Sequence, residues 1–199
     1  MLTVQEEYQK SIDEFKDIVI SMVVAKFKDE GEVTPVVFGL CKVGDKHQIA
    51  VLLGLHQFFQ KDVDKEAAAE IIKQFSKELK PLAICYISEC WMTKYDLNEE
   101  PVDKDGNYKE DTLKPSQHPN RQEVLILKFE THDKECNIMY EIVRKDNKVD
   151  LTTSTVSQLD WENKPKTYTR GLFDDLLKDN YSEYAQGLQE TLKNKTNMN

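Results

Sequence analysis

Residues 82–94, with the sequence LAICYISECWMTK, form the most apolar strand candidate of the chain. Successive side chains of a strand point to opposite faces of a sheet. Here both sets of alternate positions are apolar over the first six residues: Leu82, Ile84 and Tyr86 in one set, Ala83, Cys85 and Ile87 in the other. A strand that is apolar on both faces is buried on both faces, so we expect this one at the centre of the sheet.

The segments before this strand predict a long helix, a hairpin and a second helix. Residues 3–29 carry apolar side chains at close to a 3.6-residue period, and Gly31 follows as a stop signal. Residues 35–43 and 47–55 are rich in Val, Leu and Ile around a short glycine-containing loop, which is typical of a β-hairpin. Residues 64–80 have a second helical stripe that Pro81 terminates.

The segments after it predict three more strands and a C-terminal helix. Residues 123–131, 136–145 and 148–159 alternate with turn-forming breaks, which favours an antiparallel meander. The last of these is rich in Thr and Ser and is expected to be an exposed edge strand that could recruit a partner strand. Residues 169–192 follow a helical pattern, and the polar tail at 193–199 is expected to be frayed.

Residues 95–121 fit neither period and are expected to form a long acidic loop. Seven of the 36 acidic residues of the chain lie between Asp96 and Asp111. Connections of this length are usually functional or mobile. The strands on both sides need one sheet, so the expected fold is a single α+β domain over 1–199. It would have a mostly antiparallel sheet of about five or six strands, a long N-terminal helix, one central helix and a C-terminal helix.

The charge excludes one broad class of partner. The chain has 27 basic and 36 acidic residues, for a formal net charge of −9, and only three of the basic residues are Arg. Binding to phosphates needs basic side chains, and base recognition relies on Arg, so direct nucleic-acid binding is disfavoured. An acidic mimic of DNA that inhibits a host factor is an open alternative, although Lys residues are interspersed with the acids.

The sequence carries no targeting or membrane signal. Residues 1–16 lack the apolar core of a secretory signal, and the longest apolar runs, such as residues 49–55, are far shorter than a bilayer span. We therefore expect a cytoplasmic protein with no membrane partner. The four cysteines lie in apolar, strand-like contexts with no CxxC pair, which is typical of reduced, buried thiols.

No motif points to a cofactor or a metal. Neither a phosphate-binding glycine loop nor a zinc-binding spacing is present, and a calcium-loop-like turn at 103–107 lacks the glutamate that such a loop requires at its last position. The best enzymatic alternative is a small hydrolase or metal-dependent enzyme centred near Cys90, Glu89 and His56, because strand ends can present nucleophiles. Cysteines in apolar strands are, however, usually inert.

Aromatic side chains gather late in the chain and are the candidate partner-binding residues. They are Trp161, Tyr168, Phe173, Tyr181 and Tyr184. Trp and Tyr are enriched at interface hot spots, so a partly exposed cluster would mark a docking surface. The alternative is that these residues pack the C-terminal helix onto the sheet.

The order of the first elements resembles small uncharacterised proteins of phages and other mobile elements. The resemblance covers roughly residues 3–94 and rests on Pro35 at the first strand and on Ser88-Glu89-Cys90-Trp91 at the end of residues 82–94. It implies a phage accessory or virion-associated subunit in the host cytoplasm or the virion, and it carries no residue roles. The leading hypothesis is therefore a non-enzymatic protein that binds another protein or assembles with itself.

Overall fold

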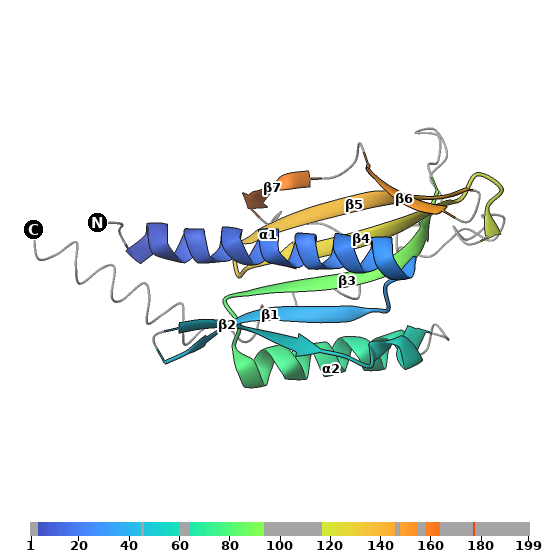
Figure 1. Ribbon diagram of the computed structural model, residues 1–199. Coiled ribbons are helices and arrows are strands. Elements are labelled where there is room, and N and C mark those ends of the chain that lie inside the picture. The colour runs from blue at the N-terminus through green and yellow to red at the C-terminus, as the bar shows by residue number, and fades with distance from the viewer. Residues whose placement is uncertain are drawn as a thin grey trace, which may run out of the picture.

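The computed structural model describes residues 4–44, 46–59, 64–93, 117–145, 148–154, 158–163 and 177. Their strands form one antiparallel sheet (Figure 1). The elements run α1 (Val4–Glu30), β1 (Val36–Val43), β2 (Lys46–Leu52), the 3₁₀ helix η1 (Leu55–Phe59), α2 (Asp64–Leu79), β3 (Ala83–Met92), β4 (Gln122–Glu130), β5 (Lys134–Lys145), β6 (Lys148–Thr153) and β7 (Gln158–Asn163). This confirms the α+β class and the mostly antiparallel sheet.

The sheet has the strand order β2-β1-β3-β4-β5-β6, and β7 also pairs with β5. β3 therefore lies between β1 and β4, as its two apolar faces predicted. Alternate residues of β1 and β3 enter two different apolar clusters, one beneath α1 and the other beside α2. The sheet is thus covered on both faces at its centre, and α1 and α2 lie on opposite sides of it.

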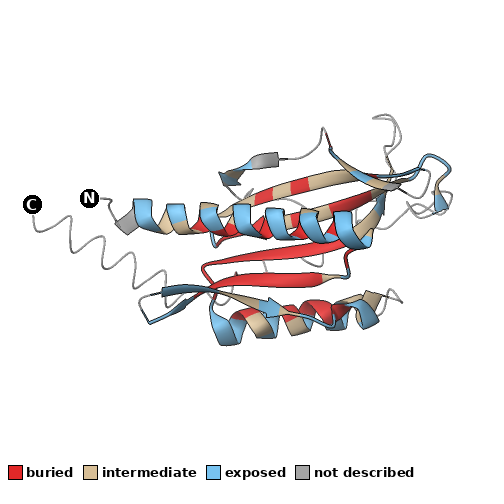
Figure 2. Ribbon diagram, in the orientation of Figure 1, coloured by how far each residue is buried: buried red, intermediate tan, exposed pale blue. Residues whose placement is uncertain are grey.

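Helix α1 lies along the sheet and buries one stripe of side chains against it (Figure 2). Its fully or nearly buried side chains recur every three or four residues: Ile12, Phe15, Val19, Val23 and Phe27. The Phe15 ring meets the Phe129 ring of β4 edge-on, at 6.1 Å between centroids. Gly31 ends the helix with a φ of 76°, a left-handed conformation that glycine adopts without strain.

Helix α2 packs so closely on β1 at Gly39 that a side chain at this position would crowd its neighbours. A Cβ atom at that position would lie 3.1 Å from the Phe75 ring of α2 and 3.3 Å from Pro81. Such a contact is tighter than ordinary packing, so glycine at the middle of β1 permits the close approach of the helix.

Three sequence predictions need correction. The strand predicted at 47–55 ends at Leu52, because the chain turns at Gly54, where φ is 82°, and Leu55 enters η1 as a buried residue. The strand predicted at 148–159 is two strands, β6 and β7, which pair with opposite halves of the long strand β5. The sheet consequently has seven strands instead of five or six.

The C-terminal helix predicted at 169–192 lies outside the described residues except for Leu177, which is a turn residue. Leu177 is buried in the apolar cluster beside α2, and its backbone N–H donates a hydrogen bond of 3.1 Å to the buried Glu130 carboxylate. Of the loop predicted at 95–121, residues 95–116 also lie outside the described residues, as does the tail at 193–199.

Candidate interaction surface

Strand β2 forms one edge of the sheet and differs in composition from the rest of this highly charged chain. Residues 47–60 contain no Asp, Glu, Lys or Arg, and this is the longest stretch of the sequence without any of the four. Within 46–59 only Leu55 is buried. Figure 2 shows the contrast between exposed β2 and its buried neighbour β1.

Two apolar side chains at this edge face solvent. Val51 is 45% exposed and Leu53, just after the strand, is 71% exposed. Natural sheets usually protect an edge strand with charges, proline or a bulge, because unpaired backbone groups attract other strands. In the part of the chain that the structure describes, β2 pairs with β1 alone and has none of these protections beyond Lys46. We call the outer backbone of Lys46–Leu52, with Val51 and Leu53, the β2 edge.

The register of the hairpin indicates which backbone groups lie along the β2 edge. Val43 pairs with Lys46 across a two-residue loop, so this pair closes the turn with both of its hydrogen bonds. Pairs then alternate along an antiparallel ladder. The N–H and C=O groups of Lys46, Gln48, Ala50 and Leu52 therefore point to β1, and those of His47, Ile49 and Val51 point outward.

Helix α1 adds apolar side chains on both of its flanks. Ile20 and Val24 line an open groove of about 520 Å³ against β5 and β6. Ile18 and Met22 are about half exposed. Residues four apart share one face of a helix, so these two lie together, on the flank opposite to that of Ile20 and Val24. The flank with Ile18 and Met22 therefore faces the side of the sheet that carries β2.

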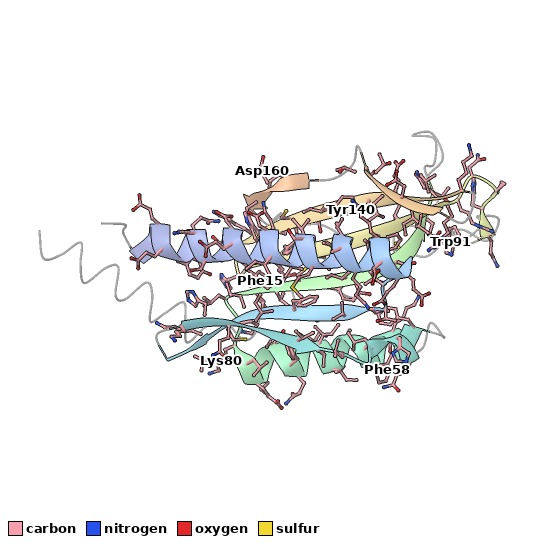
Figure 3. All side chains as sticks on the ribbon, in the orientation of Figure 1. Phe15, Phe58, Lys80, Trp91, Tyr140 and Asp160 are labelled. Carbon is pink, nitrogen blue, oxygen red and sulfur yellow. The ribbon has the colours of Figure 1, made fainter. Side chains whose placement is uncertain are left out.

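The groove on the β6 side is apolar and open. Tyr140 of β5 and Leu151 of β6 form its floor, and Lys28 of α1 lies at its rim. Tyr140, labelled in Figure 3, packs against the apolar cluster beneath α1. Burial raises the pKa of the Tyr140 hydroxyl above its ordinary value, so this phenol stays neutral at physiological pH.

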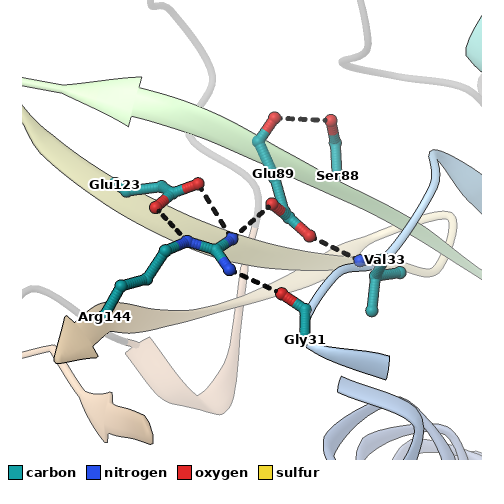
Figure 4. A network of polar contacts seen from close by, with 6 residues as sticks. All are labelled: Gly31, Val33, Ser88, Glu89, Glu123 and Arg144. Carbon is teal, nitrogen blue, oxygen red and sulfur yellow. Dashed lines mark hydrogen bonds and ion pairs between the residues drawn. The ribbon is translucent and has the colours of Figure 1, made fainter. Parts of the chain in front are cut away.

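A network of polar contacts fastens the end of α1 to the sheet (Figure 4). The Arg144 guanidinium of β5 donates to both carboxylate oxygens of Glu123 at 2.8 and 3.1 Å and to the Gly31 carbonyl at 2.8 Å, and lies 3.5 Å from Glu89. The Glu89 carboxylate also accepts a hydrogen bond from the Val33 N–H. These five residues, the Arg144 network, join α1 to β3, β4 and β5.

The electrostatics of this network centre on Glu89. Burial raises the pKa of the Glu89 carboxyl above its ordinary value, and the nearby Glu123 charge raises it further, whereas the Val33 hydrogen bond and the Arg144 charge lower it. The bidentate pairing of Arg144 and Glu123 fixes the guanidinium in place. The arrangement fits a structural clamp, since its groups are paired with one another.

The structure does not bring together the three residues of the predicted enzymatic site. Glu89 and Cys90 are consecutive in β3, so their side chains lie on opposite faces of the sheet: Glu89 pairs with Leu125 on the α1 side, and Cys90 pairs with Val124. His56 is an exposed residue of η1, next to the α2-side cluster. Burial also raises the pKa of the Cys90 thiol to about 11, which leaves it protonated and poorly nucleophilic at neutral pH.

The remaining cysteines and histidines do not suggest a metal site. All four cysteines are free thiols; Cys41, Cys85 and Cys136 are buried, as the sequence predicted, whereas Cys90 is only partly buried. Across the described ranges, no group of three or more His, Cys, Asp or Glu side chains is placed to hold a metal ion. None of the helices described here is long and apolar enough to cross a membrane.

Of the predicted partner-binding aromatic residues, the structure describes Trp161 alone. Its Nε1 donates a hydrogen bond of 3.0 Å to Asp13 of α1, and its ring lies 6.2 Å from the Phe129 ring, nearly perpendicular to it. This packing fits the core alternative, and a role of Trp161 in binding stays a prediction. Tyr168, Phe173, Tyr181 and Tyr184 lie outside the described residues.

The sequence predictions missed the β2 edge and the Arg144 network. The run without charges at 47–60 was a visible signal of the first. For the Arg144 network, the visible signal was Glu89, a charged residue within an apolar strand. No protein-family model matches this chain, and no curated protein or solved structure matches it either.

Proposed function

We propose that this protein is a non-enzymatic interaction protein that binds another polypeptide along the β2 edge. The observation that carries the proposal is an exposed, apolar edge strand without charges between residues 47 and 60, in a chain with a net charge of −9. An extended segment that pairs with β2 would satisfy the outward backbone groups of His47, Ile49 and Val51. Specificity would come from side chains packing on Val51 and Leu53.

The other expected strand-addition site is less suited to this role. We expected recruitment at residues 148–159, and β6 within them is the opposite edge strand, since it pairs with β5 alone among the described strands. β6 carries the charges of Lys148 and Asp150, however, and charges protect an edge against strand addition. The β2 edge has a partner strand on one side only within the described ranges. The proposal therefore moves the contact from the C-terminal part of the chain to the first hairpin.

The resemblance of residues 3–94 to phage and mobile-element proteins suggests the setting. We propose a phage accessory or virion-associated subunit, whose partner is either a component of the virion or a host protein. Neighbouring genes that encode structural proteins would favour the first, and neighbouring host-takeover genes the second. Neighbours with no phage or mobile-element character would contradict this setting.

A matched pair of substitutions tests the β2 edge. Val51→Lys places a charge on it, whereas Val143→Lys introduces the same charge on β5 at a residue of similar exposure, 48% compared with 45%. Affinity capture with each chain, together with light scattering of the pure proteins, should show an association that Val51→Lys weakens and Val143→Lys preserves. A strictly monomeric chain that captures no protein would refute the proposal, as would equal binding by both variants.

A further inference from the structure

We infer that the occupant of the β2 edge is a second copy of this chain, paired antiparallel about a two-fold axis that passes between Ile49 and its copy. This inference rests on the proposed function and specifies the partner. Symmetric dimers use the same surface patch on both subunits, so the patch must be complementary to itself. The β2 edge meets this requirement in its backbone, in its side chains and in its charge.

The backbone argument comes from the register. β2 has seven residues, and its midpoint is Ile49. The outward-facing residues are His47, Ile49 and Val51, which are also symmetric about Ile49. An antiparallel pairing centred there aligns the whole strand with its copy and places every outward N–H opposite an outward C=O. A shift in register would leave part of the strand unpaired.

The side-chain argument follows from the same register. On the α1 side, Ile49 would meet its own copy, and His47 would meet Val51 of the partner subunit. On the other side, Gln48 would meet Ala50 of the partner subunit, and Lys46 would meet Leu52 of the partner subunit. No two like charges face each other, and the exposed Val51 gains a side-chain neighbour from the partner subunit.

The charge argument explains why self-association would occur at this place. Two chains with a net charge of −9 repel each other over most of their surfaces. The segment 47–60 contains no acidic residue, and its nearest charge within β2 is the basic Lys46. The β2 edge is thus a place where two copies can approach without bringing carboxylates of β2 together.

The geometry of the dimer is distinctive. A two-fold axis perpendicular to the sheet keeps the faces in common, so both copies of α1 lie on one side of a continuous sheet and both copies of α2 on the other. The flanks that carry Ile18 and Met22 would then face each other across the paired β2 strands.

The first test is sedimentation equilibrium of the full chain over a range of concentrations. We expect a reversible dimer, a dissociation constant raised at least about tenfold by Val51→Lys because each dimer contains the substitution twice, and no comparable change with Val143→Lys. Thermal unfolding of both variants should match that of the wild type at a concentration at which the wild type is monomeric, because dimerisation itself stabilises the folded chain. This comparison separates a lost contact from a lost fold. A monomer at all concentrations overturns the inference.

The second test fixes the register. A chain with His47→Cys is mixed with a chain with Val51→Cys and treated with a short thiol-reactive crosslinker. The mixture should give a crosslinked heterodimer, and each variant alone should give much less. Mixing Val143→Cys with His47→Cys is the control. Equal crosslinking in all mixtures contradicts this register.

The two proposals can fail separately. If the chain is monomeric but captures a different protein that Val51→Lys releases and Val143→Lys retains, the second copy is wrong and the β2 edge stands. If the chain dimerises and Val51→Lys has no effect on the dimer, both the second copy at this edge and the role of the β2 edge in that association are wrong.

Discussion

Replacing Arg144 by Met tests whether the Arg144 network holds α1 on the sheet. Met retains much of the aliphatic packing and removes the guanidinium, which contacts Glu123, Glu89 and the Gly31 carbonyl. Hydrogen bonds to charged groups contribute about 1.5–3 kcal/mol when buried and exposed ion pairs under about 1 kcal/mol. Because the Arg144 side chain is 42% exposed, values near the lower end apply. We expect a loss of about 1–2 kcal/mol in the free energy of unfolding at neutral pH.

The pH dependence of this loss provides a sharper check. Burial raises the pKa of Glu89 in the folded state, so its contribution to stability is greatest at acid pH, below the unfolded pKa, and is lost as the pH rises through the folded pKa. Removing Arg144 raises the folded pKa further, because the charge of Arg144 lowers it in the wild type. The destabilisation by Arg144→Met should therefore shrink as the pH falls toward about 4, where carboxyls become protonated.

Urea denaturation of the wild type and Arg144→Met at the two pH values measures this effect. The control is the same substitution in a Glu89→Gln background, compared with Glu89→Gln alone. The pH dependence of the loss should be smaller there, because of the two carboxylate partners only Glu123 remains. A loss of stability that is the same at both pH values, or that is unchanged in the double variant, would refute the assigned role of Glu89. No loss at neutral pH would refute the role of the network.

One further substitution and one thiol reagent test two other parts of the fold. Phe15→Ala should reduce the free energy of unfolding by about 3–5 kcal/mol, because the residue is 1% exposed and its ring packs on Phe129. A loss below about 1 kcal/mol in denaturant titrations would contradict this packing. The Cys90 thiol, with its pKa raised to about 11, should react with a disulfide reagent at pH 8 roughly 100-fold more slowly than free cysteine. Reaction at the rate of free cysteine would contradict the raised pKa of this thiol.

The sequence predicted well the features that depend on local pattern. The two apolar faces of residues 82–94 place β3 in the interior of the sheet, and the helical stripe of residues 3–29 corresponds to α1 within one or two residues. The prediction failed where partners are remote. Whether residues 148–159 form one strand or two depends on the length of β5. β5 is long enough for β6 to pair with one half of it and β7 with the other.

The candidate site was harder to predict for the same reason. The hairpin of β1 and β2 was visible in the sequence, but β2 becomes the edge only because Val36–Leu40 pair with residues 83–87 of β3. Similarly, Glu89 forms an ion pair with Arg144, which lies 55 residues later in the sequence. The charge-free run at 47–60 becomes informative once this topology shows that it is exposed instead of buried.

Amide hydrogen exchange along β2 tests the central claim most directly, since it separates the two edges of one strand. The amides of Gln48 and Ala50 point to β1 and should be protected in dilute and concentrated solutions alike. The amides of His47, Ile49 and Val51 should exchange rapidly in the dilute chain and become protected as the concentration rises. Outward amides that exchange rapidly at every concentration, or that are already protected in the dilute monomer, would contradict a β2 edge that pairs with a second copy.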